Sequence, residues 1–358
     1  MGGRFARRAE CQTARMEIPQ YWATASGFSP HLGAEGGELV VWGWSQTSEF
    51  DAQGVARSRL AEALERVAVE GGLPDGRGYY PRMPLREPIL EEVASSSGHR
   101  LGVVTRNRMG CEVLCSDVLF IADVDVPELG GEGDAGGGDT ASDGVGGASV
   151  GGGFLTRLWR VVSGGPEPTP MTTSPQDPRP QDPRPQDRPA SEVVRAADLP
   201  APTDQESVER RACEPVWAFA QRHPELGVRM YRTAAGLRVI VTGAQAPPMS
   251  PRARDLLTEL SSDPLYVELC ATHDSYRARL TPKPFRVDWG APSWRWPFAD
   301  ERARQGHEEW LAQYRQKCDG YAVCRLVSAS GAIPTVDEQR LIALHDARCR
   351  VGSGLPLA

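Results

Sequence analysis

The feature that most constrains the fold of this chain is a long segment in its middle that cannot form a core. Residues 130–153 are rich in glycine and acidic residues and contain no basic residue. Residues 175–189, PQDPRPQDPRPQDRP, form a proline-dominated repeat of five residues. Segments of these compositions bury too little apolar surface to offset the entropy of ordering. We therefore predict a disordered insertion at 129–199, with one short amphipathic helix near 154–162.

The insertion leaves two halves that have globular composition, residues 16–128 and 200–350. We expect residues 1–15 to be a disordered extension, with Met16 an alternative start to Met1, and residues 351–358 to be a tail. Neither half contains enough strand patterns for an independent sheet with covering helices. We therefore favour one domain, built on one sheet, that the insertion interrupts.

Hydrophobic periodicity within the two halves predicts an α+β fold with a mainly antiparallel sheet and flanking helices. Helices are predicted at 53–72, 206–222 and 251–261. Strands are predicted at 38–44, at 100–106, in the run through Asp123, at 275–281 and in the hairpin 227–243, followed by an αβα tail.

The overall composition indicates a soluble, cytoplasmic protein with no membrane partner. The chain of 358 residues is 40% hydrophobic and contains nine tryptophans, yet no apolar run approaches the roughly 18 residues of a membrane helix. The net charge of −7 argues against a general electrostatic attraction to nucleic acid, although a local basic groove is compatible with it. Only Lys283 and Lys317 are lysines among the 40 basic residues, so arginine abundance alone carries no argument.

The eight cysteines lack the spacing of a recognised zinc motif. No C-x2-C pair exists, although Cys111-x3-Cys115, Cys270-x2-His273 and His345-x3-Cys349 are short, ligand-like spacings. We expect reduced, buried, structural cysteines and no zinc.

The stretch VLFIADVDVPE, residues 118–128, is the candidate site. Its apolar run predicts a buried strand, and Asp123 and Asp125 at i and i+2 would project from the same face. Carboxylates about 6–7 Å apart can share hard cations such as Mg²⁺ or Mn²⁺, as nucleotidyl transfer requires. The alternative is a pair of solvated aspartates at an ordinary strand end.

The segments that follow resemble the archaeo-eukaryotic primase and primase-polymerase superfamily, whose first motif is an apolar strand ending in D-x-D. Its second motif, a hairpin S-G-x-x-G-x-H, is similar to residues 232–238, with Gly236 in place and Arg238 where the family has histidine. The resemblance implies a third carboxylate, Asp263 or Asp288, as a further metal ligand. It also implies that Arg232, Arg238 and a last run containing Arg277, Arg279, Thr281 and Lys283 bind the phosphates of a nucleotide or nucleic acid.

The order of segments through both halves also resembles a family of uncharacterised bacterial proteins. Segments that carry this resemblance include WGWS, TRNRMG and RARLTPKPFR. Because it spans both halves, it implies one structural unit, and it implies no activity.

Two functional hypotheses follow. In the first, the protein binds a nucleotide or nucleic-acid phosphate at a Mg²⁺ or Mn²⁺ site on Asp123 and Asp125, with nucleotidyl transfer the less favoured extension because of Arg238. In the second, the protein is a non-enzymatic interaction module, and the two aspartates only form salt bridges with Arg277 and Arg279. In either case we expect the proline-rich insertion to be a spacer, with binding of a protein partner as polyproline the alternative.

Overall fold

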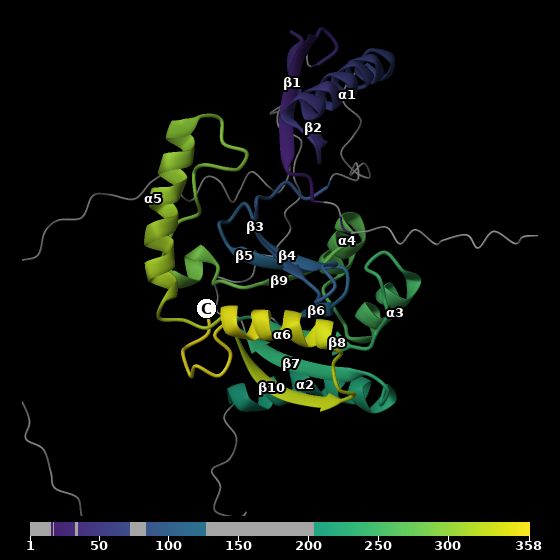
Figure 1. Ribbon diagram of the computed structural model, residues 1–358, viewed down its shortest axis with the longest axis vertical. Coiled ribbons are helices and arrows are strands. Elements are labelled where there is room, and N and C mark those ends of the chain that lie inside the picture. The colour runs from purple at the N-terminus through teal and green to yellow at the C-terminus, as the bar shows by residue number, and fades with distance from the viewer. Residues whose placement is uncertain (1–15, 17, 33–34, 72–83, 127–203) are drawn as a thin grey trace, which may run out of the picture. The chain divides into compact units, whose positions relative to one another are not determined.

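The computed structural model describes residues 16, 18–32, 35–71, 84–126 and 204–358. The predicted extension at 1–15 and the predicted insertion at 129–199 lie outside these residues. The described helices and strands belong to one compact unit, built from the chain on both sides of residues 148–203. Helices and antiparallel sheets together confirm the α+β class (Figure 1).

The first four-stranded sheet, termed here the β6 sheet, combines strands from both halves of the sequence. Its spatial order is β10-β7-β8-β6, with antiparallel pairing throughout. The strands are β6 (Phe120–Asp125), β7 (Gly227–Thr233), β8 (Gly236–Thr242) and β10 (Cys324–Gly331). Every residue of β8 is buried, as expected of a Val- and Ile-rich strand in the middle of a covered sheet.

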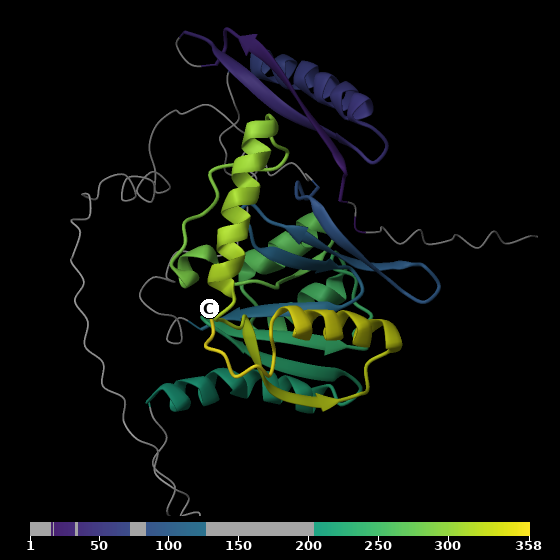
Figure 2. The same ribbon diagram turned by 60° about the vertical axis from the view of Figure 1, so that its left-hand side comes forward.

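Helices cover both faces of the β6 sheet. Successive side chains of β7 point to opposite faces: the Tyr231 ring packs 5.0 Å from the ring of His345 in α6 (Val336–Arg348). Its neighbour Arg232 instead approaches Glu209 of α2 (Asp204–Arg222), at 3.8 Å. Figure 2 shows α2 and α6 on opposite sides of this sheet.

The second four-stranded sheet, termed the β9 sheet, has the order β3-β4-β5-β9. Its strands are β3 (Ile89–Ala94), β4 (Arg100–Arg106), β5 (Glu112–Ser116) and β9 (Tyr276–Arg279). Tyr266 of α4 (Pro264–His273) joins the two sheets, because its hydroxyl lies 2.9 Å from the Ile121 carbonyl of β6 and accepts from the Arg277 N–H of β9 at 3.2 Å.

The N-terminal elements form a ββα unit of β1 (Tyr21–Ser29), β2 (Gly37–Ser45) and α1 (Glu49–Glu70). The Ser48 hydroxyl caps α1, and Gly71 ends it in the left-handed conformation. Gly43 allows the helix to approach β2 closely, since a Cβ there would lie 2.2 Å from the Ala56 backbone nitrogen.

The remaining elements are α3 (Pro251–Glu259), the short 3-10 helix η3 (Pro284–Val287) and α5 (Glu301–Cys318). Residues 351–358, expected as a tail, pack against the domain: the N–H of Ala358 donates to Ala322 at 3.0 Å, and Ala358 is buried. No described helix combines the length and the apolar character needed to cross a membrane.

The fold differs from the prediction in the number of sheets. We predicted one interrupted sheet, whereas the described strands form two four-stranded sheets and the β1-β2 hairpin. The physical reason is that β9 pairs with β5 and not with β6 or β8. Both large sheets nevertheless contain strands from before and after the insertion.

Candidate functional site

Asp123 and Asp125 lie at the end of β6, behind the buried residues Phe120, Ile121 and Ala122. The antiparallel register places Asp123 opposite Arg238 and Asp125 opposite Gly236 on β8. Glycine is required at 236 because a Cβ there would lie 2.1 Å from the Val124 carbonyl oxygen. Both aspartates lie on the face of the sheet that α6 covers. Asp123 is half-buried there, and Asp125 is exposed.

Arg238 neutralises Asp123 from within the protein. Its Nε donates to the Asp123 carboxylate at 3.1 Å, and its Nη1 donates to the Arg279 carbonyl at 2.8 Å. Only 1% of the Arg238 side chain is exposed. Burial alone would lower the pKa of Arg238, but the charge and hydrogen bond of Asp123, together with Cys349 and Cys324, hold that pKa above its ordinary value. The guanidinium is therefore a buried, permanent cation beside the first aspartate.

Asp263 approaches Asp123 through its backbone. The Asp263 N–H and the Ser262 hydroxyl both donate to the Asp123 carbonyl oxygen, at 3.0 and 2.8 Å. The Asp263 carboxylate caps α4 by accepting from the Leu265 N–H at 3.1 Å. Among the described side chains, Asp123, Asp125 and Asp263 do not form a group with the mutual proximity of metal ligands.

The other predicted phosphate ligands are distributed over different surfaces. Arg232 faces α2, away from Asp123, and donates to the Gly236 carbonyl at 3.2 Å. Arg277 on β9 forms a salt bridge with the buried Glu87, at 2.7 Å to each carboxylate oxygen. Arg279 follows it on the same face of β9 and is 8% exposed, and Lys283 lies beside the Phe285 ring, at 5.8 Å. Among the described residues, neither β9 arginine forms an ion pair with Asp123, which pairs with Arg238 instead.

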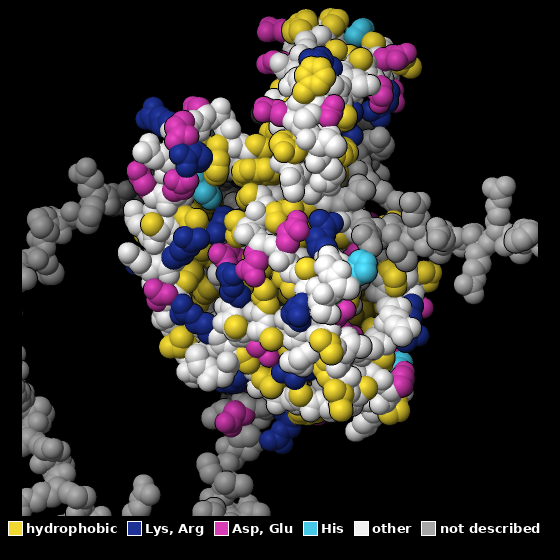
Figure 3. Space-filling view, viewed as in Figure 1, with side chains coloured by type: hydrophobic (Ala, Val, Ile, Leu, Met, Phe, Trp, Pro, Cys, Tyr) yellow, Lys and Arg dark blue, Asp and Glu magenta, His cyan; other side chains and the backbone are white. Residues whose placement is uncertain are grey.

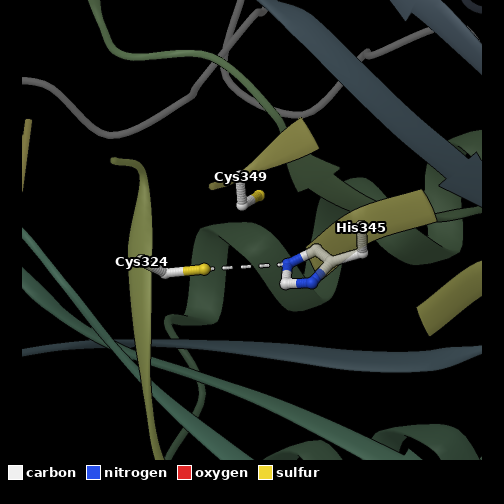
Figure 4. A group of neighbouring side chains, drawn as sticks. All are labelled: Cys324, His345 and Cys349. Atoms are coloured by element: carbon white, nitrogen blue, oxygen red, sulfur yellow. Dashed lines mark hydrogen bonds between the residues drawn. The ribbon is translucent and has the colours of Figure 1, made fainter. Parts of the chain in front are cut away.

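A second constellation lies on the same side of the β6 sheet and is formed by Cys324, His345 and Cys349 (Figure 4). Cys324 is the first residue of β10, His345 lies on the last turns of α6, and Cys349 follows that helix as its C-cap. One ligand atom from each residue lies within 4.8 Å of the others, and all three residues are buried. In Figure 4 the Cys324 sulfur and the imidazole point toward one another, and the hydrogen-bond separation between them is 4.0 Å.

Burial and hydrogen bonds, with neighbouring charges, shift the pKa values of this cluster. The hydrogen bond from the Cys349 thiol, with smaller contributions from the His345 ring and Arg238, lowers the pKa of Cys324, whereas burial raises the pKa of Cys349. Burial opposes a charge on His345, but Asp346 and Cys324 together raise the pKa of His345 overall. The Nδ1 of His345 lies 2.9 Å from Asp346, which Arg229 contacts at 3.2 Å.

Arg238 connects the two constellations, since its Nη1 lies 3.4 Å from the Nε2 of His345. A polar network therefore runs beneath α6, from Asp123 through Arg238 to His345 and Asp346. Buried networks of this kind are costly unless every member is paired, so each link constrains the positions of the strands and of α6.

The cluster of Cys324, His345 and Cys349 could hold a metal ion, which disagrees in part with the expectation of no zinc. That expectation rested on the absence of paired C-x2-C motifs. The sequence did contain half of the signal, the His345-x3-Cys349 spacing, which places both residues on one face at the end of a helix. Cys324 is brought next to them because the backbone N–H of its neighbour Val323 donates to the Cys349 carbonyl at 3.0 Å.

Comparison with known proteins adds no assignment: no family model, no curated protein and no solved structure matches the chain. The function must therefore be argued from the geometry of the two constellations. The resemblance to primases stays a prediction from the sequence.

Proposed function

We propose that this protein is a non-enzymatic interaction module in which the D-x-D strand end has a structural role. The observation that carries the proposal is the contact between Asp123 and the buried guanidinium of Arg238. Two hard cations bound at a D-x-D pair need the carboxylate oxygens to be free for coordination. A permanent cation 3.1 Å from Asp123 lowers the affinity of that carboxylate for Mg²⁺ by direct repulsion.

The positions of the predicted phosphate ligands support the same proposal. Arg238 is buried beneath α6, so its guanidinium cannot reach a nucleotide without rearrangement of the helix. Arg277 is engaged by Glu87 and Arg232 faces the opposite side of the sheet. On the face seen in Figure 3, basic and acidic side chains are interspersed, unlike the single-sign surface of a typical nucleic-acid groove.

The edge strand β10 is the element best suited to a protein partner. Among the described strands it pairs with β7 alone, and its side chains after Cys324 are half-buried or exposed. Exposed apolar residues accompany it: Leu326 is on the strand, and Ile333 and Val336 follow it. A partner segment in extended conformation can add to such an edge through backbone hydrogen bonds, with specificity from alternate side chains.

Nucleotide or nucleic-acid phosphate binding with Mg²⁺ or Mn²⁺ is the second candidate function. The observation that favours it is the exposure of Asp125 together with the partial exposure, 29%, of the Asp123 side chain. In this alternative Arg238 would orient Asp123, and an ion would bind the outer carboxylate oxygens.

Isothermal titration of the full chain with Mn²⁺ and ATP discriminates between the two functions. The interaction module predicts no metal-dependent heat for the wild type. The nucleotide site predicts heat that disappears in Asp125→Asn, whose exposed side chain can change without disturbing the core. Heat that depends on both Mn²⁺ and Asp125 would contradict the proposal made here.

A further inference from the structure

We propose that Cys324, His345 and Cys349 form a buried binding site for a thiophilic d10 metal ion, Cu⁺ or Zn²⁺. Thiolate and imidazole are the donors that these ions prefer, whereas Mg²⁺ and Mn²⁺ prefer oxygen. The site is separate from the D-x-D strand end and does not depend on the function assigned to it.

The spacing of the three donors suits an ion. Metal–sulfur and metal–nitrogen bonds of about 2.3 and 2.0–2.1 Å place the sulfur and nitrogen of a tetrahedral site roughly 3.6 Å apart. The Cys324 sulfur and the His345 Nε2 lie 4.0 Å apart, and all three donor atoms lie within 4.8 Å. Closure around an ion therefore needs side-chain shifts of about 1 Å or less at each donor, with no change of fold.

Independent evidence comes from the orientation of the imidazole. Asp346 holds the Nδ1 of His345 at 2.9 Å, and an ionised carboxylate only accepts hydrogen bonds, so Nδ1 carries the proton. The other ring nitrogen, Nε2, then faces Cys324, as the ligand atom of a metal-bound histidine must. Carboxylate–histidine–metal arrangements of this type fix the tautomer and strengthen the ligand in known metal sites. Arg229, 3.2 Å from Asp346, completes the support.

The backbone also brings the three ligands to one place. His345 and Cys349 are four positions apart at the end of α6, so they lie on the same side of the helix. The bond between the Val323 N–H and the Cys349 carbonyl fixes the start of β10 against that helix end. The ligands therefore come from two elements that are already joined, which limits the entropy lost on binding.

The surroundings favour Cu⁺ over Zn²⁺. Structural zinc is almost always bound by four ligands, and this cluster supplies three. The buried guanidinium of Arg238 lies 3.4 Å from His345 Nε2, where it would repel a dication. Two thiolates with Cu⁺ carry a net negative charge, which the same guanidinium would stabilise. On binding, the Arg238–His345 contact is exchanged for the metal bond, while the bonds of Arg238 to Asp123 and Arg279 remain.

The test is refolding of the full, reduced chain under anaerobic conditions with one equivalent of Cu⁺ or Zn²⁺, or with Co²⁺ as a spectroscopic substitute for Zn²⁺. We expect stoichiometric retention of Cu⁺ or Zn²⁺ after gel filtration. We also expect a thiolate-to-metal charge-transfer band with Cu⁺ or Co²⁺. Competition with a chromophoric chelator of each ion then distinguishes the two metals. Refolded wild-type protein that retains neither ion overturns the site without any need for a variant.

Two variants refine the result. Asp346→Asn, whose side chain is 25% exposed, should weaken metal affinity by about 10–100-fold, because it removes the carboxylate that orients His345. Cys270→Ser is the matched control: it removes another buried thiol, on α4, and should leave the affinity unchanged. Equal affinities for wild type and Asp346→Asn, or equal losses in Asp346→Asn and Cys270→Ser, would contradict the assignment of His345.

Discussion

At the scale of single residues, the ion pair of Asp123 and Arg238 dominates the candidate strand end. Removing one member of a buried pair leaves the other charge without compensation, which typically costs about 3–5 kcal/mol. We expect Asp123→Ala to lower the free energy of unfolding by about 3 kcal/mol, because Arg238 would stay buried and charged. Urea unfolding followed by circular dichroism measures the change.

The control for this prediction is Asp125→Ala, which removes an exposed carboxylate from the same strand and should cost about 1 kcal/mol or less. The double variant Asp123→Leu/Arg238→Met should be more stable than Asp123→Ala, since an apolar replacement removes the uncompensated charge. An Asp123→Ala variant as stable as Asp125→Ala would show that Arg238 is solvated or paired elsewhere.

Only the second of the two hypotheses from the sequence expected an arginine partner for Asp123, and it did not name Arg238. Arginine pairing was anticipated for Asp123 and Asp125, with Arg277 and Arg279 as the expected donors. The partner of Asp123, Arg238, was expected to contact phosphate, and it faces Asp123 because the register between β6 and β8 places the two residues opposite each other. Register between strands separated by an insertion depends on long-range packing, which local patterns do not encode.

At the scale of elements, the sequence predicted helices and strands well where turn and helix-end residues such as glycine marked their boundaries. The hairpin 227–243 corresponds to β7 and β8 on either side of a short turn, and the helix at 53–72 corresponds to α1, which ends at Gly71. Strand β1 was missed, because YWATASGFS mixes aromatic with small residues and gives weak alternation. The Cys324–His345 contact could not be predicted either, since it requires α6 to pack on the sheet that contains β10.

The N-terminus of α6 carries a testable capping box. The Thr335 hydroxyl accepts from the Glu338 N–H at 3.3 Å, and Glu338 in turn accepts from Thr335 and from the Gly243 N–H at the end of β8, at 2.7 Å. We expect Thr335→Ala to cost about 1 kcal/mol of stability. Glu338→Ala should cost more, because it also leaves the Gly243 N–H unpaired, a penalty of about 1–3 kcal/mol.

Thermal or urea unfolding of these two variants should be compared with Thr258→Ala, an exposed threonine on α3 whose loss should change stability by no more than about 0.5 kcal/mol. Equal stabilities for Glu338→Ala and Thr258→Ala would mean that α6 is not anchored to β8 through this carboxylate. The same anchor positions His345, so its loss should also weaken the metal site proposed above.

At the scale of the whole molecule, the half-buried imidazole of His273 should affect the dependence of stability on pH. Burial, with a smaller contribution from the charge of Arg277, lowers the pKa of His273 from 6.5 to about 4. The unfolded chain therefore binds more protons between those two values, so His273 causes stability to fall as the pH drops through this window and has no effect above it. We expect His273→Gln to lose less stability than wild type between pH 7 and pH 4.5, measured by urea unfolding. Parallel curves for the two proteins would contradict this pKa.

The arrangement of strands across the insertion predicts how the two halves fold. The β6 sheet takes three of its strands, β7, β8 and β10, from the second half. The β9 sheet takes its edge strand, β9, from the same half. Fragments 16–128 and 200–358 should therefore each be unfolded or aggregated alone, because each would expose unpaired edges and half of a shared core.

The two fragments should instead co-elute in gel filtration as one folded species when they are co-expressed. The same result is expected when they are produced by cleavage at a specific protease site introduced into residues 129–199. Circular dichroism of the separate and combined fragments measures the outcome, and a cooperative unfolding transition in either fragment alone would show that the halves are independent domains.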